Sequence, residues 1–436
     1  MVCVRMSIRD LLDVLRTSLW LVPAGGTLAA AALAVVLIGA SAWIGDQAGE
    51  LPLIFEAGAD GARAMLQAIA TSVITVAGVV FSVTIVALQL TSTQFSPRVL
   101  RNFLSDRPQQ WVLAVFMGTF IYSLLVLRSI ESPGAAGDGG FVPRLAVSGA
   151  LVLAFASLAA LIYFVHHISV RIGVDSIITS VTEETEDTIE ELHRDIEQEA
   201  GVERQLPATP FEGGAAVRVA AGRNGYVRLM AIGSIVRAAA DRDLRVQCQV
   251  APGDWVLAGA PLFAVAPGSS VDEEARTALV DKVVIGGQRS MSQDVAFGFQ
   301  QLVDIAVKAL SPGINDPTTA SQCLDRLAQL LVDIGHRPDL PSVLQDADGA
   351  PRVWLRFPGF EELVRHSVGA IRQHAARSPI VLAHLGRTLA TVAVALPAER
   401  APVLRAEAAT VATVARGIEP REDREAILAP LADLVR

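Results

Sequence analysis

Five small or polar residues in an apolar segment of the chain are the ones whose types and spacing could support chemistry. They are separated by three, four or seven positions: Thr71, Thr75, Gly78, Ser82 and Gln89. Residues at these separations share one face of an α-helix. In an oligomer, this neutral, hydroxyl-bearing face could line a hydrated pathway for ions or small solutes. The alternative is helix packing, because small and hydroxyl-bearing residues let two helices approach closely.

Four apolar segments are long enough to carry helices across a bilayer. Of the 436 residues, 52% are hydrophobic and only 19% are charged, and the mean hydropathy is +0.44. The segments cover residues 20–44, 65–90, 111–127 and 145–165, and each is close to the roughly 20 residues that span the hydrocarbon core. We therefore predict an α-helical membrane protein with about four transmembrane helices within residues 1–170. A cleaved signal peptide is the weaker interpretation of the first segment, because its apolar run exceeds the roughly 15 residues of a signal core.

Arginines near the ends of these segments predict their orientation, because Lys and Arg resist translocation. They precede the first segment and follow the second: Arg5, Arg9, Arg16, Arg98, Arg101 and Arg107. The loop between the first two segments is mostly acidic. We therefore expect a multi-pass protein of a bacterial inner (plasma) membrane with both termini in the cytoplasm. The apolar bodies of the segments contain no Asp, Glu, Lys, Arg or His, which disfavours proton-coupled transport.

A short helix is predicted directly after the second segment. Ser96 is a suitable N-cap and Pro97 suits the first helical position. Arg98 and Arg101 follow, and on the cytoplasmic membrane surface they could contact anionic lipid headgroups. Membrane lipid is therefore an expected partner of the chain.

Residues 171–204 form a predicted acidic helix beside the membrane. Nine carboxylates lie between Glu183 and Glu199, against Arg194 as the only Lys or Arg there. An apolar stripe runs along the same helix. The acidic faces suit a solvated stalk, or, in several copies around an axis, a vestibule that concentrates cations.

Two further regions complete the predicted cytosolic α+β part. Short alternating runs broken by Gly, Asn, Asp and Pro predict a small β-domain over residues 205–290. Helical periodicity returns over residues 291–436, where we expect a helical domain. Within it, Asn315, Asp316 and Pro317 predict a turn that opens a new helix.

Composition and motifs exclude several function classes. A net charge of −9 argues against nucleic acid, which is bound through clustered Lys and Arg. The three cysteines are far apart and form no metal-ligand spacing. The chain contains no nucleophile elbow, phosphate loop, dinucleotide fingerprint or HExxH motif. We therefore expect neither an enzyme nor a bound metal or cofactor.

Three stretches resemble the predicted bacterial membrane proteins grouped as domain-of-unknown-function family 2254. They are residues 81–98, 293–298 and 309–320. The resemblance spans nearly the whole chain and implies an amino-terminal membrane bundle with a cytosolic carboxy-terminal region. It implies no established activity, and no catalytic residue follows from it.

Two functions fit these observations. The first is a homo-oligomeric, channel-like protein whose pathway is lined by the second membrane segment. The second is a non-conducting sensor or scaffold, anchored in the membrane, whose cytosolic domain binds a protein partner.

Overall fold

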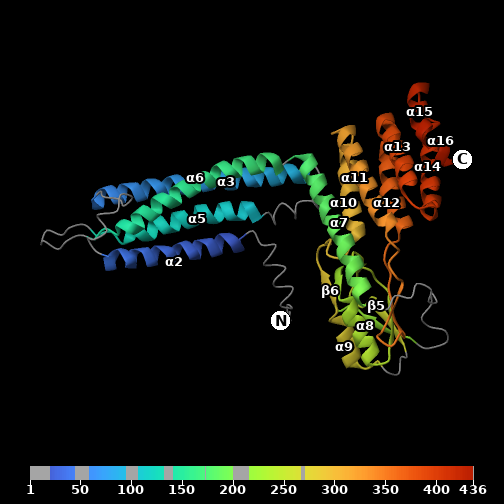
Figure 1. Ribbon diagram of the computed structural model, residues 1–436, viewed down its shortest axis with the longest axis horizontal. Coiled ribbons are helices and arrows are strands. Elements are labelled where there is room, and N and C mark those ends of the chain that lie inside the picture. Colours follow the sequence, from blue (N-terminus) through green and yellow to red (C-terminus); the bar gives the residue numbers. More distant parts are fainter. Residues whose placement is uncertain are drawn as a thin grey trace. The chain divides into compact units, whose positions relative to one another are not determined.

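The computed structural model describes residues 20–44, 58–94, 107–131, 141–171, 173–199, 216–266 and 271–435. The chain divides into two compact units, Met1–Gly173 and Val174–Arg436. Each unit has elements and packing of its own, labelled in Figure 1.

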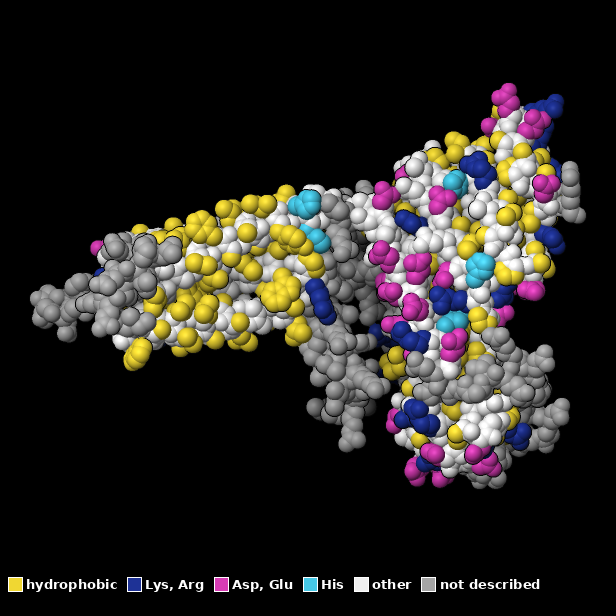
Figure 2. Space-filling model, in the orientation of Figure 1, with side chains coloured by type: hydrophobic (Ala, Val, Ile, Leu, Met, Phe, Trp, Pro, Cys, Tyr) yellow, Lys and Arg dark blue, Asp and Glu magenta, His cyan; other side chains and the backbone are white. Residues whose placement is uncertain are grey.

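The first unit contains four long apolar helices that lie side by side (Figure 1). They are α2 (Leu21–Ile44), α3 (Ala59–Gln94), α5 (Arg107–Arg128) and α6 (Arg144–Arg171). All four are long and apolar enough to cross a membrane. Figure 2 shows many hydrophobic side chains, and few charged ones, on the drawn face of the described helices of this unit. The prediction of four such helices is therefore confirmed.

Helix α5 is the central helix of this unit and contacts α2, α3 and α6. Its polar side chains are paired inside the bundle. The Tyr122 hydroxyl donates to the carbonyl of Ala146 at 2.8 Å, and Thr119 Oγ1 lies 3.0 Å from Ser157 Oγ. Because lipid offers no hydrogen bonds, such pairing lets a helix carry polar residues through an apolar bundle. The third segment looked shortest in the sequence, yet α5 begins at Arg107 and is more buried than the other three.

Glycines bring α2 and α5 close together. A Cβ at Gly26 would lie 2.7 Å from Cβ of Ala114, and one at Gly118 would lie 3.1 Å from Cβ of Ala30. This small-residue contact is the packing that membrane helices favour. Small residues therefore allow the close packing of α2 against α5.

The second unit combines strands with a layer of helices (Figure 1). Its strands are β1 (Val217–Ala220), β2 (Gly225–Met230), β3 (Arg245–Cys248), β4 (Trp255–Val256), β5 (Pro261–Ala266), β6 (Val283–Gly286), β7 (Val343–Gln345) and β8 (Pro351–Trp354). Its helices are α7 (Val174–Glu199), α8 (Ile232–Asp241), α9 (Glu273–Val280), α10 (Val295–Ala309), α11 (Pro317–His336), α12 (Phe360–His374), α13 (Pro379–Ala395), α14 (Ala401–Ala415), α15 (Arg421–Leu428) and α16 (Ala432–Val435). The prediction of a separate α+β region is confirmed.

The strands form two sheets. The larger has the order β1-β5-β3-β8-β7 and the smaller the order β4-β2-β6. Strands β3 and β8 are parallel neighbours, whereas the other pairs are antiparallel. Residues 291–436 were expected to be helical, so β7 and β8 correct that expectation. They have three and four residues, too few for a period, and β8 depends on a partner far away in the sequence.

Helix α7 packs within the second unit. Its apolar stripe contacts α10 and α11, and the side chains of Ile178, Val181, Ile189 and Ile196 are buried. Its carboxylates lie mainly on the other faces, where Glu183, Asp187, Glu190 and Glu191 are exposed. The predicted stripe is therefore covered by helices of this unit, and the acidic face remains open to solvent.

Candidate functional site

The small and polar face of α3 points away from the rest of its bundle. Thr71, Thr75, Gly78, Ser82 and Gln89 are all exposed in the single chain. Each lies two positions from a buried residue, and two positions correspond to about 200° around a helix. The buried residues at these offsets are Val73, Ala77, Val80, Thr84 and Ala87. The polar face and the packed face of α3 are therefore on opposite sides of the helix.

The three hydroxyls of this face make few hydrogen bonds to the described residues. Thr75 Oγ1 donates to the carbonyl of Thr71 at 2.7 Å, so that hydroxyl is satisfied within the helix. The hydroxyls of Thr71 and Ser82 make no hydrogen bond to any described residue. A Cβ at Gly78 would have no heavy atom within 4 Å. By contrast, Thr84 on the packed side accepts a hydrogen bond from Gln109 Nε2 at 2.9 Å.

The helix predicted after α3 falls outside the part of the chain that the structure describes. Ser96, Pro97, Arg98 and Arg101 lie outside the described residues. Their proposed capping and headgroup roles stay predictions.

The turn at residues 315–317 opens α11. Asn315 has a positive φ of 50°, and Pro317 is the first residue of the helix. Asp316 is the N-cap, and its Oδ1 accepts from the amides of Thr318 and Thr319 at 3.1 Å each. Its Oδ2 accepts from Thr319 Oγ1 at 2.6 Å. The Thr319 hydroxyl and amide hold the pKa of Asp316 below its usual value, because they stabilise the charged carboxylate.

Asp316→Ala is expected to lower the local stability of α11 by about 1 kcal/mol at neutral pH, since the helix loses its N-cap. The folded carboxyl has the lower pKa, so its contribution is present above the unfolded pKa of about 4 and is lost as pH falls through the folded value. Hydrogen exchange of the first turn of α11 measures the effect. Asp187→Ala, at an exposed position of α7, is the control and should not lower stability. An equal loss in Asp316→Ala at all pH values would contradict the capping role.

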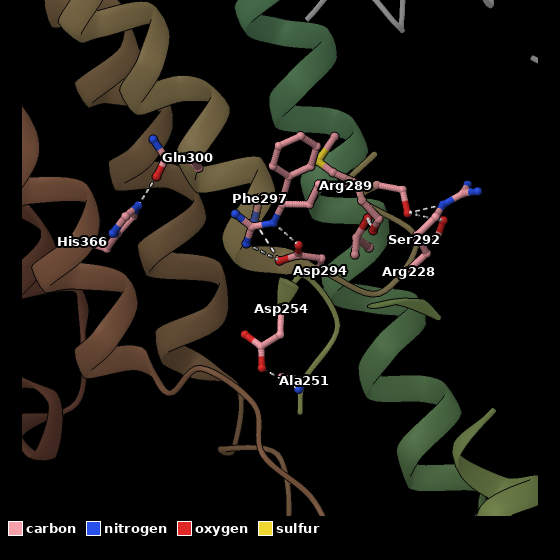
Figure 3. A network of polar contacts seen from close by, with 12 residues as sticks. Arg228, Ala251, Asp254, Arg289, Ser292, Asp294, Phe297, Gln300 and His366 are labelled. Atoms are coloured by element: carbon pink, nitrogen blue, oxygen red, sulfur yellow. Dashed lines mark hydrogen bonds and ion pairs between the residues drawn. The ribbon is translucent and has the colours of Figure 1, made fainter. Parts of the chain in front are cut away.

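A polar network that sequence reasoning did not find lies at the start of α10 (Figure 3). Asp294 is the N-cap of α10, and its Oδ1 accepts from the amide of Phe297 at 3.0 Å. Arg289 binds the same carboxylate through Nε at 2.5 Å and Nη2 at 3.1 Å. The Arg289 guanidinium also lies 5.1 Å from the centre of the Phe297 ring. Burial raises the pKa of Asp294, opposed by the bonds from Arg289. Asp294 before an apolar run was the available signal for this cap.

A neighbouring residue ties this network to the smaller sheet. Gln293 Oε1 accepts from the amide of Met230 at 2.8 Å, and Gln293 Nε2 donates to the carbonyl of Met230 at 3.1 Å. Residues 289–294 therefore join β2 to α10, and the network positions these elements.

A cavity of about 240 Å³ lies beside this network in the second unit. It is bounded by α7, by the starts of α10 and α12, by the end of α11 and by segments 338–342 and 355–359. Its charged or titratable lining residues are His193, Asp294, Asp339 and Arg356. Sequence reasoning missed this cavity, because its walls come from five separate stretches of the chain.

These observations define a class: a candidate multi-pass membrane protein with four long apolar helices and a separate α+β unit. The chain belongs to the family DUF2254, described as "Predicted membrane protein", whose model matches residues 16–391. It is also similar to the uncharacterized proteins Mb1321c of Mycobacterium bovis and Rv1290c of Mycobacterium tuberculosis. Each is 34% identical over 434 residues, which is 97% of this chain and 81% of the relative. No solved structure matches the chain.

Proposed function

We propose that this protein is a homo-oligomeric, channel-like protein of a bacterial inner membrane, with α3 helices gathered around a shared pathway for ions or small solutes. The observation that carries the proposal is the exposed small and polar face of α3, which lies opposite its packed face. Hydroxyls without partners are costly in hydrocarbon. A second copy or water would satisfy them, and an oligomer supplies both.

The flanks of this face fit the same arrangement. Ile74, Val79, Ile85 and Val86 are exposed large apolar residues of α3. They lie on either side of the polar face, where they would contact neighbouring copies or lipid. The distribution of arginines in the sequence supports a cytoplasmic location for both termini and for the second unit.

Lipid is a second partner under this proposal. A groove of about 600 Å³ between α5 and α6 is lined by Arg107, Trp111, Ala160 and Tyr163 among others. Tryptophan, tyrosine and arginine are typical of the interface between hydrocarbon and headgroups. The groove would therefore hold an acyl chain, with its headgroup beside Arg107.

Gly78→Leu is expected to reduce the current of the purified protein in planar bilayers several-fold, because the added side chain would enter the pathway. Position 78 is open in the single chain, so the substitution should leave the fold of the bundle intact. The matched control is Gly39→Leu on α2, where a side chain also meets nothing within 4 Å. The control should conduct like the original protein.

Two results would reject the channel. One is a wild-type protein that carries no current, and the other is a monomeric mass for the detergent-solubilised protein. In either case the alternative of a membrane-anchored sensor or scaffold would be favoured. The cavity of the second unit supports that alternative, because concave and largely apolar cavities are the usual sites of small ligands.

A further inference from the structure

The cavity of the second unit has a composition suited to one class of ligand. Its apolar walls include Leu192, Val295, Ile334, Leu340, Phe357 and Phe360. Its volume of about 240 Å³ exceeds the roughly 150 Å³ of an engineered cavity that accepts benzene. A ligand with an aromatic or branched apolar body would therefore fit.

The charges around the cavity leave one cation without a partner. Asp294 is paired with Arg289, and Asp339 is paired with Arg400 at 2.8 Å. Arg356 makes no ion pair or hydrogen bond within the described part of the chain. The lining therefore carries one uncompensated positive charge, on a side chain suited to hold a carboxylate.

A buried histidine presents a second polar group. His193 is 7% exposed and lines the cavity. Its Nδ1 lies 2.8 Å from the carbonyl of Ile189, one turn earlier on α7. Its Nε2 has no partner among residues 173–199, 216–266 and 271–435. Among the described residues, Nε2 is not one of the fully buried atoms that lack a partner, so it is open to the cavity, where a water or a ligand atom can hydrogen-bond to it.

The start of α12 supplies backbone donors at the same place. Its N-cap is Gly359, which has no side chain to accept from the first amides. Gly359 and Phe360 both line the cavity, and a helix of 15 residues favours negative charge at this end. Two carboxylates, Glu361 and Glu362, occupy the first turn, but neither lines the cavity and Glu361 is bonded to Arg365.

We propose that this cavity binds a small organic acid with an aromatic or branched apolar body. The carboxylate of the acid lies against Arg356 and the first amides of α12. Its body packs against Phe357 and Phe360, and His193 Nε2 hydrogen-bonds a polar atom of the ligand or a water beside it. The cation–π contact of Arg400 with the Phe360 ring, at 5.0 Å, keeps that wall in place. The site is independent of conduction, so the two proposals can fail separately.

Phenylacetate is a suitable probe for the full-length protein in detergent. At millimolar concentration it should bind saturably and slow hydrogen exchange at residues 355–362. Phenylacetamide, which has the same body without the charge, should bind at least tenfold more weakly, since hydrogen bonds to charged groups are worth more than a factor of ten. Acetate, which lacks the apolar body, should not bind measurably.

Arg356→Gln should weaken the binding of phenylacetate at least tenfold. Its side chain is exposed and makes no hydrogen bond or ion pair with another described residue, so exchange elsewhere in the unit should not change. Arg405→Gln removes an exposed arginine of α14, away from the cavity, and should bind like the original protein. The proposal is overturned if phenylacetate gives no saturable protection, if phenylacetamide binds equally well, or if the two arginine variants behave alike.

Discussion

Gly253→Ala is expected to destabilise the second unit by about 3 kcal/mol or more. Gly253 has a φ of +95° and its Cβ would lie 2.1 Å from Asp294 Oδ2 and 2.9 Å from Arg289 Nη2. The change therefore combines backbone strain with a clash against a bidentate ion pair, and each typically costs about 1–3 kcal/mol. Hydrogen exchange of residues 289–297 in the full-length protein measures the loss.

Gly259→Ala separates the two causes. Gly259 has a similar φ of +86°, but a Cβ there would meet nothing within 4 Å. It should therefore lose only about 1–2 kcal/mol, from backbone strain alone. If the two variants lose the same stability, the turn at Gly253 does not support the Arg289–Asp294 pair.

Gly298→Ala is expected to have a comparable effect at the contact of α7 with α10. The new Cβ would lie 2.1, 2.6 and 2.8 Å from Oγ1, Cγ2 and Cβ of Thr185. Rotation of the Thr185 side chain moves its Oγ1 and Cγ2 but not its Cβ, so the contact between the two Cβ atoms remains. The helices must therefore move apart, at a cost of about 2–3 kcal/mol. Thermal unfolding and hydrogen exchange of α7 measure the effect.

A double variant tests whether Thr185 is the cause. Thr185→Ala removes the two nearest atoms, so the cost of Gly298→Ala should shrink in its presence. Gly313→Ala is the matched control, since a Cβ there meets no neighbour within 4 Å. Additive losses in the double variant would show that the two residues do not compete for the same space.

Local patterns in the sequence were sufficient for the long elements. The four apolar segments, the stripe of α7 and the turn at residues 315–317 each depend on residues within a few turns of one another, where periodicity and the signals for helix starts operate. Strands β7 and β8 could not be found this way, since both are very short and β8 pairs with the distant β3. The cavity could not be found either, because His193 and Arg356, which both line it, are far apart in the sequence.

The polar face of α3 could be predicted only in part. The spacing of Thr71, Thr75 and Gly78 predicted that they share one side of a helix, because residues three or four positions apart do so in every α-helix. Spacing contains no information about which side the other helices cover. The structure answers that question: α3 packs through Val73, Ala77 and Val80, and the described helices of its unit leave the polar side uncovered.

The parallel pairing of β3 with β8 has a consequence for synthesis and for dissection of the chain. Residues 249–350 separate the two strands, so β3 emerges from the ribosome long before its neighbour exists. Until then one edge of β3 exposes unsatisfied amides and carbonyls. A fragment that contains β3 but ends before β8 would retain that open edge, and should aggregate. The smallest soluble fragment worth expressing therefore extends from α7 past Trp354.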